Sequence, residues 1–369
     1  MKYKRKIFQK KKDKDIDIKK LLIIILKFSV IPFIIYIAKI NKTDKTKIKS
    51  NKIFISKPKN ESINDSINIE SINNSIRTES INNSINNIPD LKVCVCTMGR
   101  DENRYIREFI NHYEKYGVDK IYLYDNNLDN GEKFDDIIND YVQKGFVELI
   151  NWRGKQGQVF AIMNDCYQKT KDYYDWIIFF EIDEFINLYN YTNVKQYLNR
   201  SCFKNCEIIH LNIINHSDND NLYYENKSLV ERFPSIVPLK QSQISVKSIV
   251  RGHMDNLRVT WIHWINDKFK GCNGFGGPTD LDHGNDFLYY VIDHYYSKST
   301  EEFINKINRG DIWRNTQDYI NHRTEKYLNQ NHITLEKIEM LERGIKVNLS
   351  KYKERLKKQM VRNRNRNRN

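Results

Sequence analysis

From residue 91 onward, segments with strand-like and helix-like hydrophobic patterns alternate along the chain. Strands are expected at 91–97, 119–125, 146–152 and within DWIIFFEIDEF (175–185), and helices at 102–116, near 133–143 and near 157–170. Parallel strands need long crossover connections, and helices in this position cover the sheet on both faces. The pattern therefore predicts an α/β fold with a mostly parallel sheet and flanking helices.

Ligands of such sheets bind beyond the carboxyl ends of the strands. Arg100 and Glu102 follow the first expected strand, and Asp125 ends the second. Neither G-x-G-x-x-G nor G-x-x-x-x-G-K-[ST] occurs in the chain. This absence excludes the dinucleotide-binding and P-loop classes, which need glycine-rich loops against their phosphates.

Acidic residues follow the apolar run IIFF directly. Alternation along an extended chain places Glu181 and Asp183 on the same side, with Glu184 next to them. Charges beside a buried strand are costly unless they are solvated, paired or bound to a cation. Two carboxylates there suit Mn²⁺ or Mg²⁺, with substrate phosphates completing the shell. The alternative is an ordinary transition from strand to loop with exposed acids.

The N-terminal quarter has a different composition. Residues 1–20 are rich in lysine, and residues 21–40 form an apolar run of the length that crosses a bilayer as a helix. The basic flank favours a cytoplasmic N-terminus. Residues 41–90 contain a low-complexity S-I-N repeat, which is typical of an extended, disordered stalk. A cleaved signal peptide, an amphipathic surface helix and a buried core strand, which the charged flanks disfavour, are the alternatives for the apolar run.

The formal net charge of +14 first suggests nucleic acid as a partner. The basic excess lies in residues 1–60 and 351–369, whereas 91–350 hold more acidic than basic side chains. A nucleic-acid groove is therefore disfavoured, and the membrane, through residues 21–40, is the expected partner of the positive charge. Residues 331–369 are expected to be helical at first and then a basic, disordered tail.

The segments YDNN, WIIFFEIDEF and HYYSKSTEEFINKINRG, in this order, resemble glycosyltransferase family 92 and the related family-2-like group. The resemblance spans roughly residues 91–315. It implies a GT-A domain, here residues 91–330, that uses a nucleotide sugar and a divalent metal bound through a D-x-D-type motif. The family reads D-I-D-E-F, whereas the first acid here is Glu181, so Asp183 is the stronger metal ligand.

The resemblance also implies roles for residues outside the acidic motif. His294 would be a third metal ligand, with His263, which lies between two tryptophans, as its rival. Packing inside an aromatic cluster is the alternative for both imidazoles. Lys298 and Arg309 would meet the diphosphate. The residues expected near the nucleotide are Arg100, Glu102 and Asp125, and a turn-initiating role is the alternative for Asp125.

If the reaction inverts the anomeric centre, a general base must deprotonate the acceptor hydroxyl. The loop-like acidic stretch 271–286 offers Asp280, Asp282 and Asp286, and the sequence does not choose among them.

Together these features predict a metal-dependent glycosyltransferase that moves a sugar from a nucleotide-sugar donor, with UDP as the expected nucleotide, to a glycan or glycoprotein acceptor. An anchor, stalk and GT-A domain are the layout of single-pass type II proteins of the Golgi or other secretory-pathway membranes. A catalytically silent carbohydrate-binding or adhesion module on a stalk is the alternative. Cys94 and Cys96 are expected to be buried thiols, and Cys202 and Cys206 to form a local disulfide.

Overall fold

The computed structural model describes residues 89–366, except 156, 239–244, 260–262, 264–267, 280–288 and 311–315. The expected membrane segment 21–40 therefore lies outside the described residues, as does the stalk up to residue 88. Within the described part, no helix has both the length and the hydropathy needed to cross a membrane.

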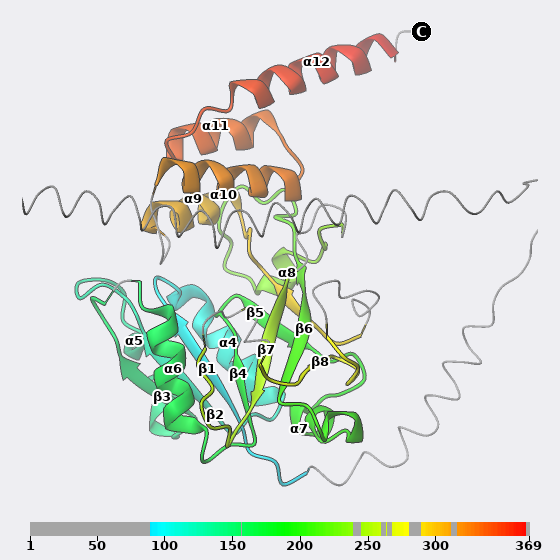
Figure 1. The fold of residues 1–369 in the computed structure, drawn as a ribbon. Helices are drawn as coiled ribbons and strands as arrows, with labels where there is room; N and C mark the ends of the chain where they lie inside the picture. Colours follow the sequence, from blue (N-terminus) through cyan, green and yellow to red (C-terminus); the bar gives the residue numbers. More distant parts are fainter. Residues whose placement is uncertain are drawn as a thin grey trace, which may run out of the picture. The chain divides into compact units, whose positions relative to one another are not determined.

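The described strands form one nine-stranded mixed sheet (Figure 1). They are β1 (Val93–Gly99), β2 (Lys120–Asp125), β3 (Val147–Asn151), β4 (Trp176–Phe179), β5 (Glu184–Asn187), β6 (Ile208–Asn215), β7 (Val246–Arg251), β8 (Gly271–Asn273) and β9 (Val291–His294). The order is β3-β2-β1-β4-β7-β6-β9-β5, with β8 also paired to β6. Strands β1 to β4 are parallel, as expected, whereas β7 runs antiparallel between β4 and β6.

The described helices are α4 (Asn103–Lys115), α5 (Asp135–Gln143), α6 (Val159–Thr170), α7 (Val194–Leu198), the 3₁₀ turn η2 (Ser201–Phe203), α8 (Leu229–Arg232), α9 (Thr300–Arg309), α10 (Gln317–Gln330), α11 (Leu335–Gly344) and α12 (Ser350–Arg366). The first three, between β1 and β4, lie where the hydrophobic period of the sequence predicts them. Helix α4 buries Tyr105, Phe109 and Tyr113 at a spacing of four residues. It is followed by Gly117 at φ +79°, a conformation that favours glycine.

Two apolar cores lie on opposite faces of the sheet. Val93 and Val95 of β1 pack into the core that includes α4 and α5. Cys94 and Cys96 of the same strand face the core that includes α6. Because neighbouring residues of a strand point to opposite faces, this split gives the three-layer arrangement expected of a parallel sheet.

Helices α9, α10 and α11 pack around a third apolar core, which includes Phe303, Tyr327 and Leu341. Figure 1 shows these helices stacked together, with α12 leading away from them. A buried ion pair fixes them to the loop after β6, because the Lys337 Nζ lies 2.8 Å from the Asp218 Oδ2. The hydroxyl of Tyr327 donates to the same oxygen at 2.6 Å.

The basic C-terminal tail is helical rather than disordered as far as Arg366. Lysine, arginine, glutamine, leucine and methionine dominate this stretch, and all of them have high helix propensity. Glu342 of α11 also pairs with Lys353 of α12 at 2.6 Å. The expectation of a disordered tail gave too much weight to charge and too little to propensity.

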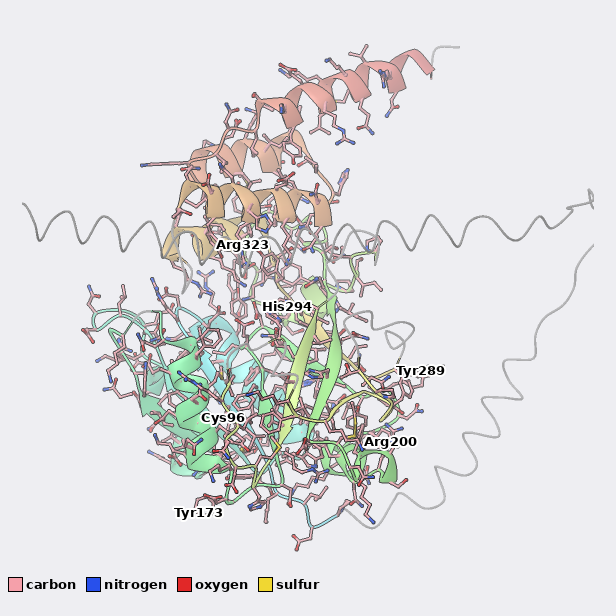
Figure 2. All side chains as sticks on the ribbon, viewed as in Figure 1. Cys96, Tyr173, Arg200, Tyr289, His294 and Arg323 are labelled. Carbon is pink, nitrogen blue, oxygen red and sulfur yellow. A yellow bond between two sulfur atoms is a disulfide. The ribbon has the colours of Figure 1, made fainter. Side chains whose placement is uncertain are left out.

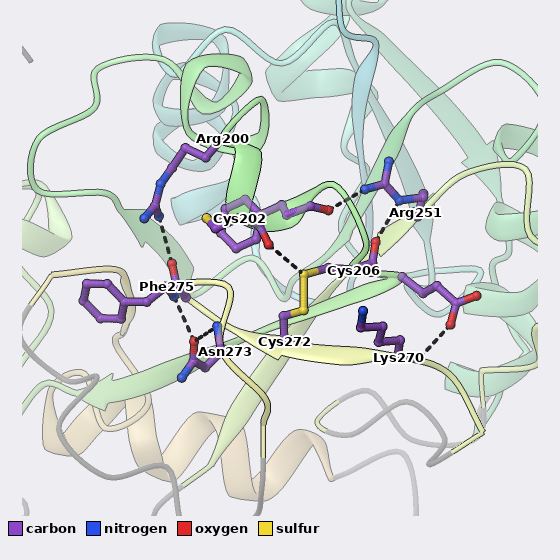
Figure 3. The surroundings of a disulfide bond; sticks show 12 residues. Arg200, Cys202, Cys206, Arg251, Lys270, Cys272, Asn273 and Phe275 are labelled. Atoms are coloured by element: carbon purple, nitrogen blue, oxygen red, sulfur yellow. Dashed lines mark hydrogen bonds between the residues drawn. A yellow bond between two sulfur atoms is a disulfide. The ribbon is translucent and has the colours of Figure 1, made fainter.

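Two disulfides connect distant parts of the chain, Cys96–Cys166 and Cys206–Cys272. The expected local Cys202–Cys206 bond is wrong, because β8 pairs with β6 and brings Cys272 within 5.8 Å, Cα to Cα, of Cys206. Figure 3 shows this bond and the backbone carbonyl of Cys202 beside it. Cys94 is a buried thiol, as expected, whereas Cys96 is bonded to a cysteine of α6.

Candidate active site

A cavity of about 310 Å³ lies at the carboxyl ends of β1 and β4 and is bounded by α9 and α10. It is large enough for a small-molecule ligand. Residues expected from the sequence that line it are Arg100, Glu102, Glu181, Asp183, His263, His294 and Arg309. Side chains separated by up to about 200 positions therefore meet in one site, which Figure 2 locates by His294 and Arg323.

Lys247 neutralises the first acid after β4. Its fully buried Nζ, on β7, donates to the Glu181 Oε2 at 2.7 Å and lies 3.1 Å from the Glu184 Oε1. Burial alone would raise the pKa of Glu181, but the neighbouring ammonium lowers it to about 2. For Glu184, burial dominates and raises the pKa to about 8, so this side chain is mostly protonated at neutral pH.

Asp183 is buried at the centre of the site. The Lys306 Nζ donates to its Oδ2 at 2.9 Å, and the His294 Nε2 lies 3.6 Å from its Oδ1. Burial opposes ionisation, but the neighbouring Lys306 ammonium outweighs it and holds the pKa of this carboxyl well below its usual range. Asp183 is therefore an ionised carboxylate with a cation on one oxygen and an imidazole facing the other.

His294 is held as a neutral imidazole. Burial lowers its pKa, against the opposing effect of Asp183. Its Nδ1 is 3.0 Å from the Asn215 Oδ1, so Nδ1 carries the proton and donates to the amide oxygen. The Nε2 that faces Asp183 therefore presents a lone pair, which is the form a metal requires.

His263 also lines the cavity, and burial lowers its pKa to about 3. The ring is fixed by its Nδ1, which is 3.1 Å from both the Ser245 Oγ and the Val246 carbonyl oxygen. Both imidazoles proposed from the sequence thus face the same space as Glu181 and Asp183.

A second charge cluster surrounds Glu102 after β1. The Arg309 Nη2 donates to the Glu102 Oε1 at 2.8 Å, and the Lys298 Nζ donates to Oε2 at 3.2 Å. Arg309 also donates to the backbone carbonyl of Arg100, so it joins α9 to the loop after β1. Lys298 lines an adjoining cavity of about 270 Å³ together with Glu102, Lys306 and Arg309.

Asp125 does not line the main cavity, whereas its neighbour Asn126 does. Both of its carboxylate oxygens have partners. Arg153 donates to Oδ2 at 2.7 Å, and the backbone of Asn127 donates to Oδ1 at 3.0 Å. The second of these bonds is the turn interaction that was the alternative for this residue.

The proposed general bases Asp280, Asp282 and Asp286 lie outside the described residues. Their assignment remains a prediction from the sequence.

Several lining residues were not predicted. Lys247 had a signal in the sequence, because a lysine within the apolar run ISVKSIV implies a buried counter-charge. The α10 residues Tyr319, Arg323 and Lys326 had no such signal in the sequence. Arginine and lysine at helical spacing have the same pattern as the solvent-exposed face of a helix.

The side chains that face the cavity include the kinds of ligand atom that a divalent ion binds. Asp183 offers an ionised oxygen and His294 an imidazole lone pair, and Glu181 and His263 face the same cavity. Among the described residues, no three His, Cys, Asp or Glu side chains are already arranged as a metal site. Lys306 occupies one oxygen of Asp183, so an ion that used this oxygen would displace that ammonium.

Comparisons with known proteins bear on the same stretch of chain. The model of glycosyltransferase family 92 matches residues 89–337, more than half of the chain. A family 92 protein of Oryza sativa subsp. japonica is 32% identical over 98 residues, which cover 26% of this chain and 16% of that protein. A family 92 protein of Ricinus communis is 26% identical over 98 residues, covering 26% and 17%. The match thus spans about a sixth of these relatives' length.

Among solved structures, S. aureus TarS 1-349 in complex with UDP-GlcNAc is similar to this chain with a TM-score of 0.33 and 12% identity. The similarity covers 68% of this chain and 70% of that one.

Proposed function

The chain belongs to glycosyltransferase family 92, and from this premise we propose that it transfers a sugar from a nucleotide-sugar donor, with UDP as the nucleotide, to a glycan or protein-linked acceptor. The observation that carries the proposal is the cavity beyond β1 and β4. There an ionised Asp183, two neutral imidazoles and several cations face one space, all within the matched residues.

Transfer of the sugar leaves a nucleoside diphosphate, whose developing negative charge must be stabilised. Arg309 and Lys298 are placed beside the loop after β1, where the nucleotide of such folds binds. In the described state both pair with Glu102. This carboxylate holds the two cations in position for a phosphate while balancing their charge.

Asp183 and His294 would hold Mn²⁺ or Mg²⁺, with Glu181 and His263 as further ligands. Such an ion supplies positive charge to the leaving diphosphate. Asn215 keeps the His294 Nε2 unprotonated, and Lys247 keeps Glu181 ionised. Lys306 pairs with Asp183 in the described state, so an ion that used this oxygen would replace the ammonium there.

For the acceptor side, we propose inversion with Asp280, Asp282 or Asp286 as the base that takes the acceptor proton. The support is chemical, since an inverting transfer needs a base and these carboxylates lie in an acidic, glycine-containing stretch.

For localisation, we propose a type II protein of the Golgi or another secretory-pathway membrane, anchored by residues 21–40. The two disulfides support it, because structural disulfides persist in oxidising compartments.

The test is Asp183→Asn, which keeps the shape of the side chain and removes its charge. We expect sugar transfer to fall by a factor of about 10² to 10³ and Mn²⁺-dependent nucleotide binding to be lost, because a charged ligand is removed. Asp172→Asn, at an exposed acid paired with Lys171, is the matched control and should leave both unchanged. Full activity in a folded Asp183→Asn protein would contradict the assignment.

A further inference from the structure

Three cations surround the ring of Tyr296 at the α9 and α10 side of the cavity. The Lys306 Nζ is 4.8 Å, the Arg323 Cζ 4.5 Å and the Lys326 Nζ 4.7 Å from the ring centroid. All four residues line the cavity. Figure 2 labels Arg323, which lies on α10.

The spacing of α10 produces this arrangement. Tyr319, Arg323 and Lys326 are separated by four and three residues, so they share one face of the helix, and that face is turned to the cavity. Tyr296 is itself buried, with 2% of its surface exposed, and its ring attracts the cations by the cation–π effect.

Two of the three cavity carboxylates pair with cations outside this group, and the third pairs with Lys306. Glu181 pairs with Lys247, and Glu102 pairs with Arg309 and Lys298. Asp183 pairs with Lys306. Lys326 forms no ion pair with any carboxylate that the structure describes. Burial, followed by Arg323 and Lys306, lowers its pKa to about 8, as expected for an ammonium crowded by like charges.

We propose that Lys306, Arg323 and Lys326 form an anion subsite that binds the diphosphate of the donor. This inference rests on the proposed function and adds to it the residues of α10. Arg323 offers the planar fork that matches phosphate oxygens, and the two lysines add point charges. Lys306 links the subsite to Asp183, so the diphosphate lies next to the metal ligands while α10 forms the other wall.

The test is binding of inorganic pyrophosphate to the full chain, measured by calorimetry in buffer without divalent cations, so that no metal carries the anion. Arg323→Gln and Lys326→Gln each remove one charge and keep most of the side-chain length. We expect each to weaken binding about tenfold and the double variant about a hundredfold, as for loss of charge-assisted bonds. Arg343→Gln, on the exposed side of α11, is the matched control and should bind like wild type.

Lys326→Arg keeps the charge and should keep binding within about threefold of wild type, which separates loss of charge from loss of packing. Pyrophosphate binding that is absent in wild type, or unchanged in the double variant, overturns the subsite. A chain that transfers sugar but whose double variant binds pyrophosphate like wild type loses only this inference. A chain that binds pyrophosphate through these residues but transfers no sugar retains the subsite and loses the proposed function.

Discussion

At the scale of residues, Lys247 shows how a buried charge organises the acidic strand end. It lies inside an apolar strand with its side chain fully buried, and it neutralises Glu181 while Glu184 is held mostly protonated. These three ionisable groups therefore carry little net charge, with Lys247 and Glu184 fully buried and the Glu181 side chain 39% exposed. The sequence contained this lysine and both acids, but their pairing depends on β7 lying beside β4, which no local pattern indicates.

We predict that Lys247→Met destabilises the fold by about 1–3 kcal/mol, because the buried Glu184 loses a polar partner and the partly exposed Glu181 loses its counter-charge. Lys120→Met is the matched control, since Lys120 pairs with Glu148 at the surface between β2 and β3. Its loss should cost less than about 1 kcal/mol. Denaturant unfolding of both variants measures the difference, and equal losses would contradict the role given to Lys247.

At the scale of elements, the first half of the domain follows from its sequence. β1, α4, β2, α5, β3 and α6 each lie within a few residues of the expected range, because their hydrophobic periods are local signals. Within the expected range 175–185 the apolar residues form β4, as expected, whereas a second strand, β5, begins at Glu184 and pairs with β9 instead of β1. The turn between them carries Glu181 and Asp183, so these acids follow the carboxyl end of β4, as the sequence indicated.

Cysteine pairing also belongs to this scale, since it depends on which strands are neighbours. We predict two thiols in the denatured, unreduced protein, Cys94 and Cys202, and one thiol in Cys202→Ser. Peptide mapping should recover Cys96 linked to Cys166 and Cys206 linked to Cys272. A peptide that links Cys202 to Cys206 would contradict the described pairing of β6 with β8.

At the scale of the whole molecule, the site is assembled from two regions that lie far apart in the sequence. The sheet supplies the acids and imidazoles, and α9 and α10 supply the opposing cations. The acids were predictable because strand ends of parallel sheets are known ligand edges. Arg323 and Lys326 were not, because a cation that faces a cavity and one that faces water look the same in a helical pattern.

The distribution of charge along the chain also belongs to the scale of the whole molecule. The net +14 is concentrated near the two ends, whereas the site itself is lined by three acids and five lysine or arginine side chains. Such a site can attract a diphosphate and a divalent ion together, which a uniformly basic groove would not do.

The most direct test of the central claim is a donor screen. The purified chain is incubated with a panel of nucleotide sugars and a glycan acceptor mixture, with Mn²⁺ or with a chelator, and both released nucleotide and glycosylated product are measured. We expect product with a UDP-sugar in Mn²⁺, none with the chelator, and about 10² to 10³ times less with Asp183→Asn. Absence of product and of nucleotide release with every donor would contradict it and favour a silent carbohydrate-binding module.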